Sequence, residues 1–145
     1  MGVDYGSQKL FLYGIDAAGN RSSLPVETTI WFDTVAPQVA VTRQIPAVSL
    51  GSYLAQPVPL LEGTASDGSE QVEIVVRLTS PTYGTQRTVI QVQNGQWSYF
   101  PDLSMTGDYT LTLEAWDAAG NLTALGSWRL QVTSGFSLWL PFIFK

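Results

Sequence analysis

The sequence predicts an all-β fold, a β-sandwich of about seven strands with an additional β-hairpin at its N-terminal end. Apolar residues make up 45% of the 145-residue chain and charged residues only 13%, roughly half of the usual charged share of about 25%. Thr, Ser, Val, aromatic residues, Gly and Pro fill the difference, a composition typical of short strands joined by many turns. Stretches of alternating polarity and a turn sequence that occurs twice indicate the same fold class.

The pentapeptide Asp-Ala-Ala-Gly-Asn occurs at residues 16–20 and again at residues 117–121, an offset of 117 − 16 = 101 residues. Alternating apolar residues precede both copies, so that Leu10 aligns with Leu111. The Asp carboxylate caps such a turn, while Gly or Asn supplies the positive φ that a hairpin needs. An offset near 100 residues matches the size of one small β-sandwich. The sequence therefore predicts one complete unit, preceded by the end of a related one.

Seven alternating stretches bounded by turn-forming residues are predicted as the strands of the complete unit. They are Gln38–Thr42, Val58–Ala65, Gln71–Thr79, Arg87–Gln93, Gln96–Phe100, Asp108–Trp116 and Ser127–Ser134. Asn94-Gly95 signals a two-residue hairpin turn, and Pro46 and Gly51 predict a loop over Gln44–Gln56. Alternation along the strands directs one set of side chains inward: Val72, Ile74, Val76, Leu78, Tyr109, Leu111, Leu113, Ala115, Trp128, Leu130 and Val132.

Pro37 ends the segment Asp33-Thr34-Val35-Ala36-Pro37, where a proline stops strand pairing and stiffens a link. We therefore expect three parts in the chain. Residues 1–32 would be the terminal hairpin of a preceding module, residues 33–134 a complete sandwich, and residues 135–145 an apolar tail.

The composition excludes several classes of chemistry. The chain contains neither Cys nor His, so it has no disulfide, zinc–thiolate site or Ser-His-Asp triad. Lys9 and Lys145 are its two lysines, and the net charge of −5 argues against a nucleic-acid surface. Residues 1–20 lack a signal peptide, which favours a mature fragment. The apolar run Phe136–Phe144 is too short to span a bilayer.

Five segments, taken in order, resemble the bacterial immunoglobulin-like (Ig-like) repeat family of surface proteins and exported multidomain enzymes. They lie within residues 33–133 and are Asp33-Thr34-Val35-Ala36-Pro37, Leu61-Glu62-Gly63-Thr64-Ala65-Ser66-Asp67, Gly95-Gln96-Trp97-Ser98-Tyr99, Gly107-Asp108-Tyr109-Thr110-Leu111 and Ala115-Trp116-Asp117-Ala118-Ala119-Gly120-Asn121. The resemblance implies an Ig-like Greek-key β-sandwich of seven strands, an extracellular or cell-surface location, tandem modules and no catalytic activity.

The N-terminal hairpin departs from this pattern because it is apolar on both faces. Phe11, Tyr13 and Ile15 occupy its outer face, where the second copy carries Thr112, Glu114 and Trp116. A lone hairpin is not stable in water, so we expect cover on both sides. Three interpretations are open: an array divided within a module, packing onto the complete sandwich, and strand addition to another chain. Packing within the same chain is the interpretation we favour.

Four aspartates in turns or linkers are candidate Ca²⁺ ligands: Asp16, Asp33, Asp67 and Asp117. Ca²⁺ takes six to eight oxygen ligands, and turns bring carboxylates close to backbone carbonyls. The alternative is that each Asp only caps its own turn, and this is the interpretation we favour. No other cofactor is expected.

Aromatic residues suggest a second kind of site, a platform for a glycan. Its candidate members are Trp97, Trp116, Trp128 and Tyr99. Trp97 and Trp128 are predicted on inward faces, which favours the core for both. Trp116 points outward beside the turn and is the best single candidate for contact with a ligand or a neighbouring module. The sequons beginning at Asn20 and Asn121 are interpreted as incidental, because the turn itself requires Asn.

The tail, residues 137–145, carries aromatic residues, including Trp139 and Phe142, and ends in Lys145. Two interpretations stay open: an extra strand packed on the sandwich or hairpin, and a C-terminal sorting signal that lacks the sortase pattern. In either case an unpaired apolar tail would be a contact surface. We count Trp139 and Phe142, together with Phe11, Tyr13 and Ile15, as candidate partner contacts.

The predicted function is that of a non-catalytic structural or adhesive module of an exported bacterial protein. It would act as a spacer or an assembly contact, with neighbouring modules or chains of the same protein as partners. One alternative is an accessory C-terminal domain of an extracellular hydrolase. Another is a carbohydrate-binding module that contacts a cell-surface glycan.

Overall fold

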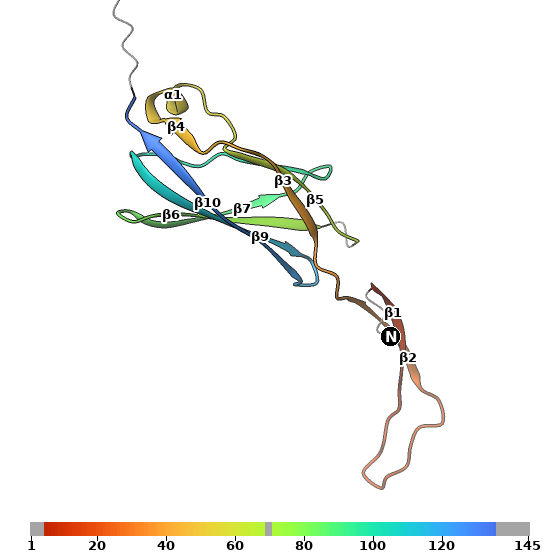
Figure 1. Cartoon of the computed structure of the whole chain (residues 1–145). Helices are drawn as coiled ribbons and strands as arrows, with labels where there is room; N and C mark the ends of the chain where they lie inside the picture. Colours follow the sequence, from red (N-terminus) through yellow and green to blue (C-terminus); the bar gives the residue numbers. More distant parts are fainter. Residues whose placement is uncertain (1–4, 69–70, 136–145) are drawn as a thin grey trace, which may run out of the picture.

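The computed structural model describes residues 5–68 and 71–135. Within this part the chain forms a two-sheet β-sandwich and, at its N-terminal end, a separate two-stranded hairpin (Figure 1). The sandwich carries a five-stranded sheet on one side and a three-stranded sheet on the other. The predicted all-β sandwich with an additional hairpin is therefore confirmed.

The two sheets are mainly antiparallel. The three-stranded sheet has the order β3 (Gln38–Gln44), β5 (Leu61–Ser66), β8 (Gln96–Tyr99). The five-stranded sheet has the order β4 (Ala47–Ser49), β10 (Leu122–Thr133), β9 (Gly107–Asp117), β6 (Val72–Ser80), β7 (Gly84–Gln91). Only the short β4–β10 pairing in this sheet is parallel.

The core lies between the two sheets and is built from alternate residues of each strand. On β6 and β9 the inward positions predicted from the alternation are all buried. Leu130 and Val132 of β10 are buried as well, and Trp128 is half-buried against the core. Val75 is an exception to simple alternation because it is buried on the outer face of β6, where Val89 and Glu114 are its cross-strand neighbours.

Trp97 packs across a glycine in the three-stranded sheet. A Cβ atom added to Gly63 would lie 2.1 Å from the carbonyl oxygen of Ala40 and 2.5 Å from the Trp97 ring. The indole nitrogen of Trp97 donates a hydrogen bond to the carbonyl of Thr64 at 3.3 Å. The sequence places glycine here because any side chain would fill the space that the indole occupies.

The hairpin turn between β7 and β8 follows its sequence signal. Asn94 and Gly95 both have positive φ, 52° and 75°, and the flanking Gln93 and Gln96 exchange backbone hydrogen bonds of 2.9 Å, as the Asn-Gly signal predicts. The corner before β9 is held by the Tyr109 hydroxyl, which donates to the Met105 carbonyl at 2.9 Å.

The predicted loop over Gln44–Gln56 is wrong in part. The segment contains the short strand β4 and a six-residue helix, α1 (Leu50–Ala55). Tyr53 anchors the helix, because its ring is buried and its hydroxyl donates to the Pro101 carbonyl at 2.8 Å. So short a helix shows no apolar periodicity, and tertiary contacts rather than local signals determine it.

The hairpin consists of β1 (Tyr5–Leu12) and β2 (Val26–Asp33), paired antiparallel from Tyr5↔Asp33 to Leu12↔Val26. Figure 1 shows it pointing away from the sandwich. Phe11, Tyr13 and Ile15 are exposed. The interpretation that the hairpin packs onto the sandwich of its own chain is therefore wrong.

The hairpin lies apart from the sandwich because β2 ends at Asp33 and the chain continues through a linker that is hydrogen-bonded to the near end of the sandwich.

Among residues 5–68 and 71–135, no helix has the length and apolarity needed to cross a membrane.

Candidate functional site at the linker junction

The two copies of the Asp-Ala-Ala-Gly-Asn turn share the same geometry. In the hairpin, Asp16 Oδ1 accepts hydrogen bonds from the backbone N–H groups of Ala18 and Asn20 at 2.9 and 2.8 Å. In the sandwich, Asp117 Oδ1 accepts from the backbone N–H of Asn121 at 2.8 Å. The glycines have matching φ values of 87° and 90°. The predicted role of Asp as the cap of each turn is thus what the structure shows.

The second copy does more than turn the chain. The side-chain amide of Asn121 donates to Asp117 Oδ2 at 2.8 Å and also reaches the linker, where it donates to the carbonyls of Asp33 and Val35 at 3.1 and 3.3 Å. Thr123 adds a 2.6 Å hydrogen bond from Oγ1 to the Pro37 carbonyl. This turn therefore clamps the linker onto the sandwich.

The first copy has the matching internal bond but a different surrounding. Asn20 Nδ2 donates to Asp16 Oδ2 at 2.9 Å, as Asn121 does to Asp117. Within the described residues no linker carbonyl accepts from Asn20. Asn20 is therefore the comparison residue for the linker hydrogen bonds that Asn121 forms.

Three of the four candidate aspartates meet at this junction. A carboxylate oxygen from each of Asp33, Asp67 and Asp117 lies within 4.8 Å of the others. Asp33 ends β2, Asp67 follows β5 and Asp117 ends β9, so three distant segments contribute. Asp16 lies in the hairpin turn and is not part of this cluster.

The electrostatics of the cluster favour a positive partner. Burial raises the pKa of Asp117, but hydrogen bonds from the side chain and backbone of Asn121 outweigh it, so the pKa lies below its ordinary value. Asp33 Oδ2 is buried and has no hydrogen-bond donor among the described residues. Like charges at such a separation repel one another, and a cation placed among them offsets this repulsion. The chemistry of three clustered carboxylates fits a divalent cation such as Ca²⁺.

Two of the four aromatic candidates for a glycan platform are buried. Trp97 is 3% exposed and belongs to the core, as predicted, and Tyr99 is buried with it. Trp116 lies half-buried on the outer face of β9. Two coplanar exposed rings are needed to stack on a glycan, and Trp97 and Trp116 do not supply them.

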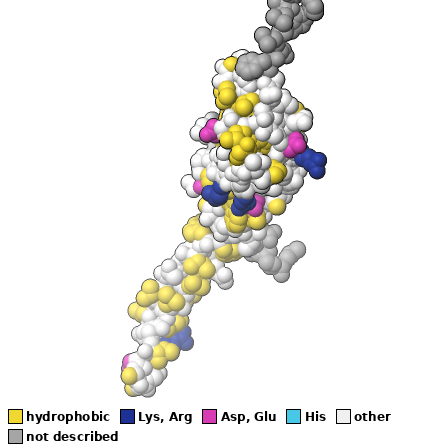
Figure 2. Space-filling view, turned by 90° about the vertical axis from the view of Figure 1, so that its left-hand side faces the viewer, with side chains coloured by type: hydrophobic (Ala, Val, Ile, Leu, Met, Phe, Trp, Pro, Cys, Tyr) yellow, Lys and Arg dark blue, Asp and Glu magenta, His cyan; other side chains and the backbone are white. Residues whose placement is uncertain are grey.

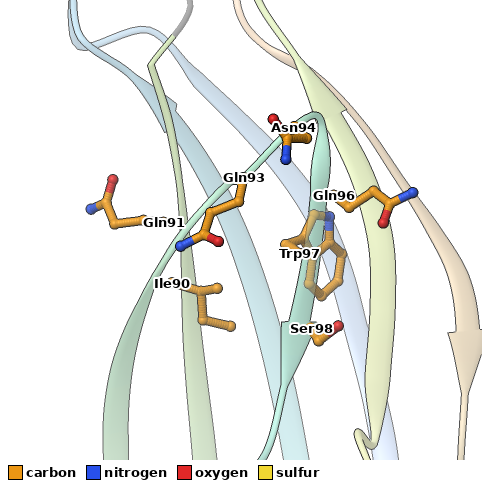
Figure 3. Close-up of a pocket in the computed structure, with 7 residues that line it drawn as sticks. All are labelled: Ile90, Gln91, Gln93, Asn94, Gln96, Trp97 and Ser98. Carbon is orange, nitrogen blue, oxygen red and sulfur yellow. The ribbon is translucent and has the colours of Figure 1, made fainter.

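An open hollow of about 410 Å³ lies beside Trp97, between β7 and β8. Figure 3 shows Gln91 and Gln96 pointing away from each other on its two sides, with Ile90 and Trp97 between them. Its lining also includes Gln93, Asn94 and Ser98. These amides and the hydroxyl can form hydrogen bonds, but the lining carries no carboxylate or amine that could act as a general acid or base.

The outer face of the five-stranded sheet carries an ion pair between Arg77 and Glu114, with Nη1 and Oε1 2.7 Å apart. The hydrogen bond from Arg77 holds the pKa of Glu114 below its ordinary value. Arg77 also lies directly opposite Arg87 on β7. Glu114 thus neutralises one of the two adjacent positive charges, those of Arg77 and Arg87. We interpret the ion pair as a structural feature of the sheet surface.

The remaining candidates separate into three outcomes. Phe11, Tyr13 and Ile15 are exposed on the hairpin, as a contact surface requires, and the Arg21 guanidinium covers the Tyr13 ring at 3.3 Å from its centroid. Trp139 and Phe142 lie outside the described residues. Trp31 is 74% exposed and is therefore a further candidate for partner contact. The comparison of the two turn copies in the sequence did not identify it.

No family model matches the sequence. A search of curated proteins finds no match either.

Proposed function

We propose that the chain is a non-catalytic structural module of an exported bacterial protein, an Ig-like spacer that holds its neighbour at a fixed angle. The observation that carries the proposal is the clamp at the linker. A spacer with a free linker would transmit no orientation, whereas Asn121 and Thr123 bind three carbonyls of residues 33–37. The same role would serve a module appended to an extracellular hydrolase.

Further support comes from the topology. β4 runs parallel to β10 at one edge, β9 lies between β10 and β6, and β3, β5 and β8 form the opposing sheet. Ig-like sandwiches have a comparable division of strands, and they carry a Tyr at the start of a late strand whose hydroxyl bonds backbone upstream. Tyr109, bonded to Met105, fits this description.

A pair of matched variants tests the clamp. Asn121→Ala removes the bonds to Asp33, Val35 and Asp117, and we expect it to destabilise the sandwich by about 1–2 kcal/mol in urea unfolding. Asn20→Ala removes the same residue from the hairpin turn, where no linker is bound, and should leave the unfolding of the sandwich unchanged. Equal effects of the two substitutions would contradict the clamp.

We include in the proposal that a divalent cation at Asp33, Asp67 and Asp117 stiffens the junction. The support is the proximity of the three carboxylates and the buried Asp33 Oδ2 without a donor. Three carboxylates supply part of the shell of six to eight oxygens that Ca²⁺ takes. A ligand that binds only the folded state raises its stability.

Melting temperatures in CaCl₂ and in chelator test the cation. We expect Ca²⁺ to raise the melting temperature of the unaltered chain and to lose this effect in Asp33→Asn. Asp16→Asn is the matched control, because Asp16 caps the equivalent turn outside the cluster, and it should keep the full Ca²⁺ effect. A melting temperature that is the same in CaCl₂ and in chelator would contradict the cation site. The proposed clamp by Asn121 and Thr123 would be unaffected by that result.

A further inference from the structure

The hairpin is the structural counterpart of β9 and β10. Its strands pair as theirs do, with Leu10 opposite Thr28 where Leu111 is opposite Trp128. Counting from the shared turn, β1 matches β9 at the offset of the repeat. The offset between β2 and β10 differs by one residue from the offset between β1 and β9. The reason is that the number of irregular residues between the turn and the second strand differs in the two copies. By this pairing Ile30 corresponds to Leu130.

Side chains at corresponding positions differ sharply in exposure. Leu12 is 56% exposed and its counterpart Leu113 is 1% exposed. Ile30 is 42% exposed and its counterpart Leu130 is fully buried, at 0%. Leu10, also exposed, corresponds to buried Leu111. The inner face of the hairpin thus has the chemistry of a core face without the sheet that covers it in the sandwich.

The free edge of β1 shows what is missing beside the hairpin. In the sandwich β9 lies between β10 and β6, whereas β1 pairs only with β2 in the part of the chain described. A strand edge with unpaired N–H and C=O groups binds another strand readily. In the sandwich that edge takes β6, whose Val76 and Leu78 face Leu113 and Leu111.

We propose that the hairpin is the last strand pair of a second Ig-like sandwich, completed by a unit like β3–β8 that precedes it in the same polypeptide. A β6-like strand would pair antiparallel with β1, and a sheet like β3–β5–β8 would cover Leu10, Leu12 and Ile30. The linker of that unit would bind Asn20 as residues 33–37 bind Asn121. This inference rests on the proposed role as one module of an array.

The outer face indicates how the preceding module differs from the one described. Phe11 and Tyr13 stand where β9 has Thr112 and Glu114, and Trp31 stands where β10 has Gln131. Figure 2 shows hydrophobic side chains along the projecting hairpin. The neighbouring strand of the missing unit is therefore expected to be apolar on both faces, as β6 is at Val75.

The test supplies the missing unit from this chain itself. A second copy of residues 33–105 is placed directly before Tyr5, since Tyr5 is the counterpart of Thr106 (5 + 101). We expect hydrogen exchange of the β1 amides to slow by at least about 100-fold relative to the unextended chain. Asn20→Ala, silent in the unextended chain, should then lower the melting temperature of the added module.

The control carries Leu10→Asp and Leu12→Asp in the extended chain. It should lose protection in the hairpin and the added copy, while the original sandwich melts as before. Unprotected β1 amides in the extended chain without these substitutions would overturn the inference. A second result would also overturn it: protection of the β1 amides in the unextended chain that increases with protein concentration, together with a dimer mass in light scattering. The partner of β1 would then be a second copy of the chain. Neither result affects the test of the Asn121 clamp.

Discussion

At the scale of single residues, a few side chains decide how the sequence folds and where the linker goes. Asn121 joins its own turn to the linker, and Asp117 orients Asn121 by accepting from its amide and backbone N–H. Gly63 leaves the space that the Trp97 indole fills. The turn Asp could be predicted from sequence because its bonds are local. The meeting of Asp33 and Asp67 with Asp117 could not, because it depends on three separate segments.

Gly63→Ala should destabilise the sandwich by about 3 kcal/mol, because the added methyl group meets a backbone carbonyl and the Trp97 ring in a packed core. Urea unfolding followed by tryptophan fluorescence measures the change. Gly135→Ala is the control, since its Cβ would make ordinary contact with Ser49 Oγ at 3.5 Å. A Gly63→Ala protein as stable as the control would show that Trp97 can move aside.

The depressed pKa of Asp117 predicts a pH dependence. A carboxyl group whose pKa is lower in the folded state stabilises that state above its ordinary pKa of about 3.9. This contribution is lost as the pH falls through the depressed value. The stability difference between the unaltered chain and Asp117→Asn should therefore shrink as the pH is lowered from 6 towards 2, in unfolding measured across that range. A difference that grows with acidity would contradict the assignment.

At the scale of elements, alternation predicted the buried faces of β6 and β9 correctly because each strand is long and has one face in the core. Signals were weaker where tertiary contacts determine the element. Helix α1 follows Ser49, whose side chain makes no capping hydrogen bond, and Pro46 and Gly51 favoured a loop. The exposed position of Trp31 could not be read from the repeat, because the irregular residues after the turn shift β2 by one position against it.

Tyr53→Phe tests whether α1 is anchored by its hydroxyl. We expect a loss of about 1 kcal/mol, because the Pro101 carbonyl loses its buried donor. Leu54→Ala, on the exposed side of the same helix, should change the unfolding free energy by less than about 0.5 kcal/mol. Equal effects in thermal or urea unfolding would show that the helix is held in another way.

At the scale of the whole molecule, the described residues form a two-sheet sandwich joined through a hydrogen-bonded linker to a separate two-stranded hairpin. The recurrence of the turn at an offset of 101 residues predicted the additional hairpin. It did not predict the placement of the hairpin, because an apolar hairpin is compatible with cover by its own sandwich, by another module or by another chain. The linker bonds direct the hairpin away from the sandwich.

Removal of residues 1–32, with the linker kept, should leave the melting temperature of the sandwich within about 2 °C of the original, because its core includes no hairpin residue. Binding of a hydrophobic dye should fall, since the exposed apolar surface of the hairpin is lost. A large loss of stability would indicate that the hairpin packs on the sandwich in solution.

The central claim is that the clamp fixes the orientation of the linker, and a distance distribution tests it most directly. The chain has no Cys, so Thr29→Cys on the hairpin and Gln86→Cys on the sandwich, both exposed positions, give two unique spin labels. Electron spin resonance should report one narrow distance, which broadens in Asn121→Ala and stays narrow in Asn20→Ala. A broad distribution in the labelled chain with Asn121 intact would contradict the claim.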